Sequence, residues 1–497
     1  MNIVLAPGLA FLSGYLVVSA GWPGERTNKS ERWMKLFMSA GFGIGIFSIA
    51  FFVERWLDIV DILAADLCLI TLLLAAYLVA RARRTSEDLP ASKFADIKLP
   101  NWLHRSLMAS FAISILAALY ATVLRALARP HGDGWDAFAI WNLHARFLFL
   151  GGSHWRAGLS ALIPWSHPDY PPLVPAAIAH IWSYMGHDDP IVPAILGLVF
   201  TFATLGLLVS SLATLRGITS AALAGITLAS TPFFIEQGAS QYADIPLSFF
   251  FLAAIALLHL FQQRSAQVPD GSLTGLFVLA GVAAGFAAWT KNEGLLFLFA
   301  FQVSQVAAVP SRRHPPANES RVNAGRKLVI LLMATTPFLL LSLWFKHFIA
   351  PSGDLFSGPE AMLRKILTPG RYWAILRWYG KDFLRFGNWV VPTTVLFVAI
   401  SLLSPSAGMR RQKTAFRSSV VTLAITLCGY FAVYVITPNE LYWHLRFSLN
   451  RLFLQLWPTV IFSFFLSLSG QTSFSSQSES NSGPNTCKPV KNFVSPT

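Results

Sequence analysis

Long apolar runs alternate with short polar segments along the whole chain. Each run has the roughly 17 to 25 residues that an α-helix needs to cross a bilayer. The pattern predicts an all-α polytopic membrane protein with about thirteen transmembrane helices. We expect them near residues 2–20, 34–53, 60–80, 104–128, 190–213, 217–235, 243–263, 273–289, 292–310, 328–349, 388–404, 418–437 and 449–469.

One further apolar stretch is too short to be counted. Residues 172–185, with the sequence PLVPAAIAHIWSYM, fall short of the roughly 20 residues of a full span. The preceding Pro171 and Pro172 prevent an earlier helix start, because proline lacks a backbone donor and restricts the residue before it. We therefore expect an interfacial or re-entrant helix here.

Basic residues between the predicted helices orient them, because cytoplasmic loops are enriched in Lys and Arg. With thirteen helices, all the clusters fall on one side of the membrane. This places the N-terminus outside and the Ser-rich tail, which we expect to be disordered, in the cytoplasm. The clusters lie within residues 26–35, 81–105, 312–327 and 410–417.

The predicted topology divides the chain into four parts. Residues 1–103 contribute three N-terminal helices, and residues 104–350 contain a core with a large outer loop at 129–190. Residues 351–469 begin with a second outer loop, which ends near residue 388. The remaining residues, 470–497, form the tail.

Composition narrows the class of protein. Of 497 residues, 54% are hydrophobic and 12% are charged, whereas soluble proteins contain about 25% charged residues. The net charge of +14 is explained by the cytoplasmic loops, so we expect no nucleic-acid partner. The three cysteines form no CxxC motif. The chain has no GxGxxG or Walker loop, and we expect no cofactor.

The first outer loop is rich in histidine and tryptophan, and six of the eleven histidines lie in it. Tryptophan favours the membrane interface. His167 and Asp169 are possible zinc ligands together with His154 or His187, since zinc accepts nitrogen and oxygen ligands. No tight spacing such as HExxH accompanies them, so a metal site is not indicated.

Asp136 opens the predicted helix DAFAIWNLHARFLFL. At a helical period it falls on the same apolar stripe as Ile140, Leu143, Phe147 and Leu150. An acid in apolar surroundings is suited to accept a proton in catalysis. The alternative is a structural role as a helix N-cap, which aspartate also favours.

Three further charges lie at the outer ends of predicted helices. Asp244 opens a helix in QYADIPL, and Lys291 and Glu293 lie in GFAAWTKNEG between two helices. Ionisable residues inside membranes are functional candidates. The structural alternatives are a helix cap for Asp244 and a local neutralising pair for Lys291 and Glu293.

The second outer loop is unexpectedly basic. Arg377, Lys381 and Arg385 share one helix face at i, i+4 and i+8, among aromatic residues typical of an interfacial helix. Such cations bind lipid phosphate or extend toward anionic headgroups. The last helix begins with further candidates for phosphate binding, namely His444, Arg446 and Arg451.

The order of these motifs resembles one known family. An Asp after a span, then HPDYPPL, QYADIPL and GFAAWTKNEG, is similar to the GT-C glycosyltransferases that use polyprenyl-phosphate sugars, such as protein O-mannosyltransferases and lipid A aminoarabinose transferases. The resemblance covers residues 104–310, and YWHLRFSLNRL more loosely. Residues 1–103 resemble no family that we can name.

The resemblance implies an inverting sugar transfer from the lipid carrier to an acceptor hydroxyl at the outer, periplasmic or lumenal, face of the membrane. The acceptor is a glycan, lipid or protein, and we expect the membrane to be a bacterial plasma membrane. Asp136 matches the family's base, although the family often has an acidic pair there; Asp169 and Asp244 are the available second acids. His167 and the PPL run match the motif before the short helix, and Lys291 matches an element associated with binding. Asp169 and Tyr170, which lie between His167 and this run, are further candidates for substrate binding.

Two other functions fit the same pattern. A transporter or lipid flippase also carries charges within its membrane helices, but we find no inverted repeat of spans. A polymerase or ligase of surface polysaccharide also has large outer loops, and it attacks a lipid diphosphate.

Overall fold

The computed structural model describes residues 3–24, 28–83, 99–265, 270–308, 321–353, 358–389 and 413–468. Within these residues the regular structure is helical, and no strand occurs. Nine of the described helices are long and apolar enough to cross a membrane, or ten if one bent pair is a single span. The chain is therefore an all-α, multi-pass membrane protein, as predicted. The span expected at 388–404 lies outside the described residues from position 390 onward.

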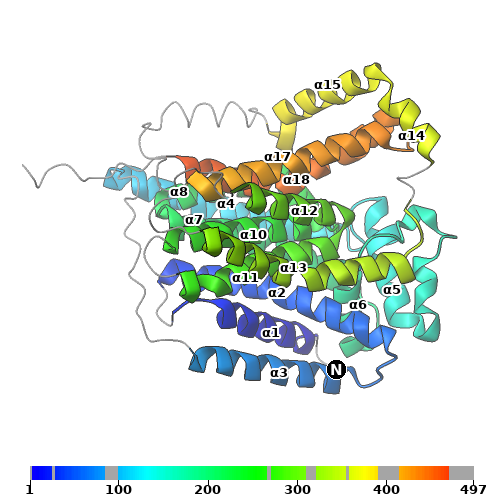
Figure 1. Cartoon of the computed structure of the whole chain (residues 1–497), viewed down its shortest axis with the longest axis horizontal. Coiled ribbons are helices and arrows are strands. Elements are labelled where there is room, and N and C mark those ends of the chain that lie inside the picture. The colour runs from blue at the N-terminus through cyan, green and yellow to red at the C-terminus, as the bar shows by residue number, and fades with distance from the viewer. Residues whose placement is uncertain are drawn as a thin grey trace, which may run out of the picture.

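The long helices run side by side in one bundle (Figure 1). Two further helices, α1 (Leu5–Gly21) and α12 (Asn292–Ala308), have 17 residues each. The nine long helices are α2 (Lys29–Trp56), α3 (Ile62–Ala82), α4 (Asn101–Ala128), α7 (Ile191–Leu215), α10 (Asp244–Arg264), α11 (Asp270–Thr290), α13 (Arg321–Phe348), α17 (Lys413–Ile436) and α18 (Leu441–Ser467).

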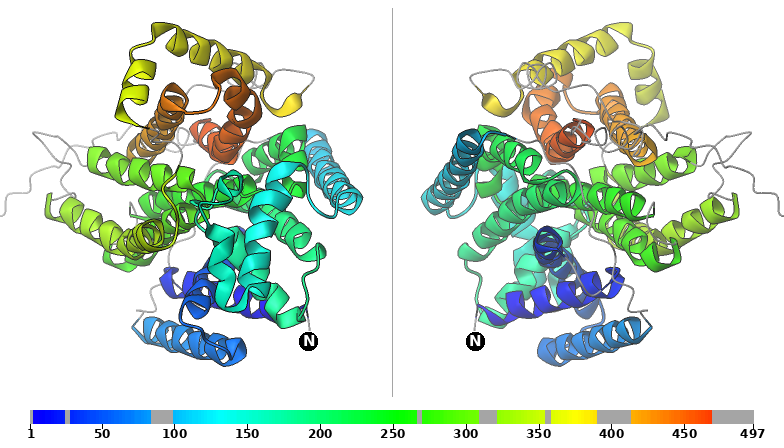
Figure 2. Two further views of the ribbon diagram at one scale, coloured as in Figure 1. Left: turned by 90° about the vertical axis from the view of Figure 1, so that its right-hand side faces the viewer. Right: turned by 90° about the vertical axis from the view of Figure 1, so that its left-hand side faces the viewer.

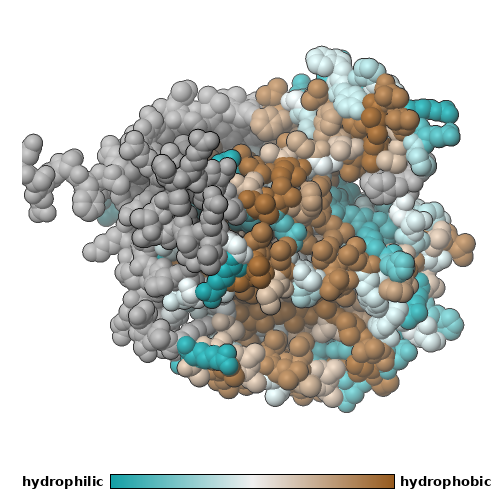
Figure 3. Space-filling view, viewed as in Figure 1, coloured by the Kyte–Doolittle hydropathy of each residue, from teal (hydrophilic) through white to brown (hydrophobic). Residues whose placement is uncertain are grey.

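Helix α10 lies at the centre of the bundle, and all residues of its apolar segment are buried. It packs against α7, α11 and α18, as expected for a helix that is hydrophobic all round. In the apolar segments of α3 and α4, only 6% and 11% of the residues are buried. Apolar side chains cover the middle of the visible face, and hydrophilic ones gather at one end (Figure 3). We call this end, where α10 begins, the site end.

The span predicted at 217–235 is not one straight helix. The chain forms α8 (Ile218–Ala229) and α9 (Pro232–Ala239), which are bent by 65° relative to each other. Pro232 occupies the first turn of α9, where its missing backbone donor is tolerated, but it cannot continue a preceding helix. The side chain of Trp457 donates to the Thr231 hydroxyl at 3.2 Å and so holds the break against α18.

The first large loop forms a compact group of short helices at the site end (Figure 2). They are the π-helical turn η1 (Ala137–Trp141), α5 (Asn142–Leu150), the 3₁₀ segments η2 (Gly152–Leu159) and η3 (Pro164–Ser166), and α6 (Leu173–Met185). The short helix predicted at 172–185 is present as α6. Ten of its thirteen residues are buried, so it lacks the exposed face expected of a helix on the bilayer surface.

The second loop contains α14 (Pro359–Ile366) and α15 (Pro369–Arg385), followed by the 3₁₀ turn η5 (Phe386–Asn388), and it lies across the ends of α17 and α18 (Figure 2). Arg371 Nε donates to the Val435 carbonyl at 2.9 Å, and Lys365 Nζ donates to the Thr437 carbonyl at 2.7 Å. These oxygens lie at the C-terminus of α17, where helix carbonyls lack internal partners and attract cations.

Helices α1 and α2 approach closely at two glycines. A Cβ atom on Gly14 would overlap the Ser39 carbonyl, and one on Gly43 would overlap the Ala10 carbonyl. Small residues at such crossings allow membrane helices to pack backbone to backbone.

We expect Gly14→Leu to weaken this packing, because overpacked side chains typically cost about 1–3 kcal/mol. The midpoint of thermal unfolding in detergent should fall. Gly8→Leu on the same helix is the matched control, since a Cβ at Gly8 meets nothing within 4 Å. Equal midpoints for the two variants would contradict the close approach.

Candidate functional site

Charged side chains from separate parts of the chain meet at the site end. Asp136 precedes η1, Asp244 is the first residue of α10, and Arg451 lies in α18. Lys291 is the residue between α11 and α12, and Glu293 lies in the first turn of α12. The structure therefore brings together five of the residues selected from the sequence, and we call these five the acid–base network.

Arg451 is the centre of the acid–base network. Its Nη1 lies 2.6 Å from Asp136 Oδ2, and its Nε lies 2.8 Å from Asp244 Oδ2. The guanidinium also lies 4.5 Å from the centre of the Tyr242 ring. Planar guanidinium groups favour such combined carboxylate and aromatic contacts. Arg451 thus bridges the two acids.

Asp244 is fully buried and has three partners. Lys291 Nζ lies 3.1 Å from Oδ1, and Gln455 Nε2 donates to the same oxygen at 2.6 Å; Arg451 binds the other oxygen. Within the described residues its carboxylate is bonded by these three side chains and not by the backbone of α10, so the cap alternative does not describe it. Tyr430 donates to Gln455 Oε1 at 2.6 Å and fixes the orientation of the amide.

Lys291 is the one residue between α11 and α12. Its Nζ lies 2.9 Å from Glu293 Oε1 as well as close to Asp244. The local pair considered as an alternative therefore exists, and it is also part of the larger network. Three carboxylates face two cations, which leaves one excess negative charge. Asp136 is the most exposed of the three, at 25% of its side chain, against 19% for Glu293 and 0% for Asp244.

The backbone around Asp136 presents its side chain to Arg451. Two glycines with positive φ, Gly132 at 84° and Gly134 at 79°, precede it and permit the tight turn. Asp136 makes no cap bond to the helix that follows, which argues against the N-cap interpretation. The next five residues form the π-helical η1, and π-turns inside helices are frequent at functional sites.

The loop between α9 and α10 leads into Asp244 and contacts residues on both sides of Asp136 in the chain. Gln241 has a left-handed φ of 62°, and its amide accepts from Asn142 Nδ2 at 2.8 Å and donates to the Pro130 carbonyl at 2.9 Å. Burial raises the pKa of the neighbouring Tyr242 to about 12, with Asp136 adding to the effect. Tyr242 therefore keeps its proton at neutral pH.

Three rings stack in the segment before α6. His167 lies on Tyr170 with ring centroids 4.8 Å apart, and Tyr170 lies on Trp141 at 5.7 Å. His167 has a left-handed φ of 48°, which closes a turn in which Tyr170 N donates to its carbonyl at 2.9 Å. Lys291 Nζ is 5.6 Å from the Tyr170 ring, so this stack borders the acid–base network.

Asp169 belongs to a neighbouring polar group. Asn292 Nδ2 donates to Asp169 Oδ2 at 2.7 Å, and Lys346 Nζ donates to the Asp169 carbonyl at 2.6 Å. Lys346 also donates to Asn292 Oδ1 at 2.6 Å. Asp169 and Lys291 are thereby held together, because Asn292 follows Lys291 in the chain.

The four remaining candidates lie on α15 and on the first turns of α18. Arg377, Lys381 and Arg446 are exposed. Lys381 lies over the Trp378 ring at 4.9 Å, and Arg446 lies over Phe447 at 5.8 Å. His444 shares the α18 face of Arg451 and makes a 2.8 Å hydrogen bond with Thr437.

Sequence reasoning missed four residues of these groups. Gln455 follows Arg451 by one helical turn, and Lys346 lies near the end of a predicted span, so polar side chains at helical spacing were the available signal. Asn292 lies within the quoted TKNEG motif. Tyr242 lies within QYADIPL, but a tyrosine beside the start of a helix did not stand out as a candidate residue.

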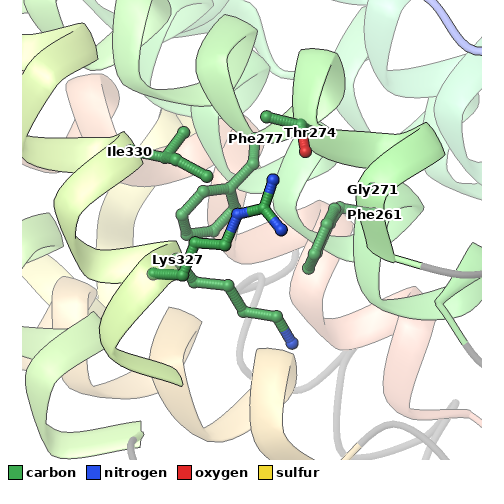
Figure 4. Close-up of a pocket in the computed structure, with 7 residues that line it drawn as sticks. Phe261, Gly271, Thr274, Phe277, Lys327 and Ile330 are labelled. Atoms are coloured by element: carbon green, nitrogen blue, oxygen red, sulfur yellow. The ribbon is translucent and has the colours of Figure 1, made fainter. Parts of the chain in front are cut away.

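No three His, Cys, Asp or Glu side chains converge to hold a metal ion in the described part of the chain. A small pocket lies between the ends of α10, α11 and α13 that are remote from the acid–base network (Figure 4). Phe261, Phe277 and Ile330 form its apolar wall, and Arg326 and Lys327 also line it. It has no carboxylate, so it is not a second copy of the candidate site.

Comparisons with known protein families, with curated proteins and with solved structures found no match to this chain.

Proposed function

We propose that this protein is an inverting glycosyltransferase that moves a sugar from a polyprenyl-phosphate carrier to an acceptor hydroxyl. Asp136 is the general base. The acceptor is a glycan, a lipid or a protein, and the proposal requires no metal or other cofactor.

The sharing of Arg451 between Asp136 and Asp244 is the observation that best supports this proposal. Asp136 is partly exposed, whereas Asp244 is completely buried. When Asp136 takes a proton, Arg451 keeps a carboxylate partner in Asp244. A buried cation without a partner is costly, and this arrangement avoids that cost during the reaction.

The reaction follows from these positions. The acceptor oxygen attacks the anomeric carbon of the sugar while its proton passes to an oxygen of Asp136. The bond from the anomeric carbon to the phosphate oxygen breaks, and polyprenyl phosphate leaves with the electron pair. Nearby cations stabilise the charge on the phosphate, as electrostatic catalysis requires. The candidates for this role are basic residues of the acid–base network, of the Asp169 group and of the first turns of α18, namely Arg451, Lys291, Lys346 and His444.

The proposal includes a topology of thirteen spans. The site end then faces the outside of a bacterial plasma membrane, with the N-terminus outside and residues 470–497 in the cytoplasm. Helices α14 and α15 would lie at the outer interface, where Arg377 and Lys381 meet lipid phosphates. His167, Asp169 and Tyr170 would form a wall of the sugar site.

The chemical form of the donor provides the test. Purified protein should transfer sugar from a polyprenyl monophosphate donor and not from the corresponding diphosphate, with release of polyprenyl phosphate measured by mass spectrometry. Transfer from the diphosphate alone would instead identify a polysaccharide polymerase or ligase. Movement of the lipid across liposome membranes without sugar transfer would identify a flippase.

A further inference from the structure

A second group of buried titratable side chains lies apart from the acid–base network, where α2, α3 and α6 meet. It contains Glu54 of α2, Asp66 of α3, and His180 and Tyr184 of α6. His180 Nε2 lies 2.8 Å from Asp66 Oδ2, and the Tyr184 hydroxyl donates to the same oxygen at 2.5 Å. Neither the sequence motifs nor the proposed reaction uses these residues.

Asp66 is the only buried residue of α3. The rest of this helix contacts mainly α1. Only 6% of the residues in the apolar segment of α3 are buried. The two hydrogen bonds to Asp66 are therefore the polar attachment of α3 to α6. Helix α6 begins three residues after Tyr170, so this attachment lies one helix away from the candidate site.

The two carboxylates have no strong cation to balance them. Glu54 and Asp66 are 5% and 0% exposed, and Glu54 Oε2 and Asp66 Oδ1 have no hydrogen-bond partner. Within the described residues neither acid forms an ion pair with lysine or arginine. Arg55, the nearest arginine in sequence, donates its Nη2 to the Gly152 carbonyl at 3.1 Å.

Buried charges of one sign cannot all persist, because leaving water is costly and like charges repel. Burial raises the pKa of Tyr184, and its bond to Asp66 raises it further, so Tyr184 is a donor and not a counter-ion. His180 alone could offset one carboxylate, which still leaves the other unbalanced. Asp61 at the start of α3 is a further nearby acid and no source of positive charge. The one titratable group of α1, which packs on α3, is Tyr15.

We propose that Glu54 and Asp66 form a proton-binding site that keeps α3 attached to α6. One exchangeable proton occupies the pair at neutral pH. When it leaves, two adjacent carboxylates repel each other across the α2–α3 junction. Since the attached state favours the protonated form, attachment is strongest at low pH and weakens as the pH rises through proton release. This inference does not depend on the proposed glycosyl transfer.

Infrared spectroscopy of the full-length protein in lipid nanodiscs tests for the proton directly. At neutral pH we expect the carbonyl band of a buried protonated carboxylic acid, shifted by deuterium exchange. The band should disappear in Glu54→Gln and in Asp66→Asn, which provides a second variant if one fails to fold. Glu360→Gln, at an exposed acid of α14, should leave it unchanged. A missing band in the unmodified protein, or a band that appears only after a chelator removes a bound cation, would overturn the proposal.

A native cysteine reports the attachment. Cys68 is exposed on α3, two residues beyond Asp66, and Cys428 on α17 is also exposed. A spin label on Cys68, with Cys428 and Cys487 replaced by alanine, should become more mobile as the pH rises. In Glu54→Gln its mobility should stay low, because glutamine cannot ionise. A label on Cys428 alone is the control, and an equal pH response at both positions would refute a local release of α3.

Discussion

Asp136→Asn should reduce sugar transfer by about 10²- to 10⁴-fold, the usual contribution of a positioned general base, while donor binding is retained. Asparagine preserves the size of the side chain and its contact with Arg451 Nη1, but its amide cannot accept the proton of the acceptor hydroxyl. Initial rates with a radiolabelled polyprenyl-phosphate sugar measure the loss, and equilibrium binding of the same donor measures what remains.

The matched control for this prediction is Asp188→Asn. Asp188 lies in the same segment between α4 and α7, and its Oδ2 pairs with Arg146 Nε at 2.9 Å, away from Arg451. Its substitution should leave the rate near that of the unmodified protein. If Asp136→Asn transferred sugar at the normal rate, Asp136 would not be the base.

Asp244→Asn should lower stability more than the loss of any single surface charge. It leaves Lys291 and Arg451 with less negative charge at a buried position, and breaking a buried pair from one side typically costs about 3–5 kcal/mol. The midpoint of thermal unfolding in detergent should fall accordingly. The physical reason is the complete burial of Asp244, where water cannot replace the lost carboxylate.

A double variant separates this electrostatic effect from a packing defect. Asp244→Asn combined with Arg451→Gln should be less destabilising than the sum of the two single changes, because the second removes a cation that the first has left unpaired. Glu360→Gln breaks an exposed pair with Arg364 and should shift the midpoint little. Strict additivity of the two buried changes would mean that the ion pair contributes no coupling.

The sequence predicted the all-α membrane class because apolar runs of spanning length depend only on composition and period. It also selected Asp136, Asp244 and Lys291, since an acid or amine in an apolar run is conspicuous wherever the helix packs. Which side chains pair with which depends on helix packing that one sequence does not reveal. The bridge from Asp136 to Asp244 through Arg451 spans more than 300 residues of chain.

The errors have local causes. The bend between α8 and α9 was missed because hydrophobicity continues through Pro232, although proline is a known helix breaker. Helix α6 was predicted as an interfacial or re-entrant helix because its length is short, but burial of His180 against Asp66 could not be foreseen without the position of α3. Gln455 was overlooked because a neutral amide is less conspicuous than a charge.

The attachment of α15 to α17 has a consequence for sequence divergence. Arg371 donates to the backbone oxygens of Tyr434 and Val435, and every amino acid supplies the same carbonyl. This contact therefore places no constraint of its own on the side chains of Tyr434 and Val435, which are held instead by their burial in the core, whereas it does constrain Arg371. Selection through this contact should act on one partner only, so substitutions at the end of α17 that keep its core packing should leave Arg371 unchanged in homologues.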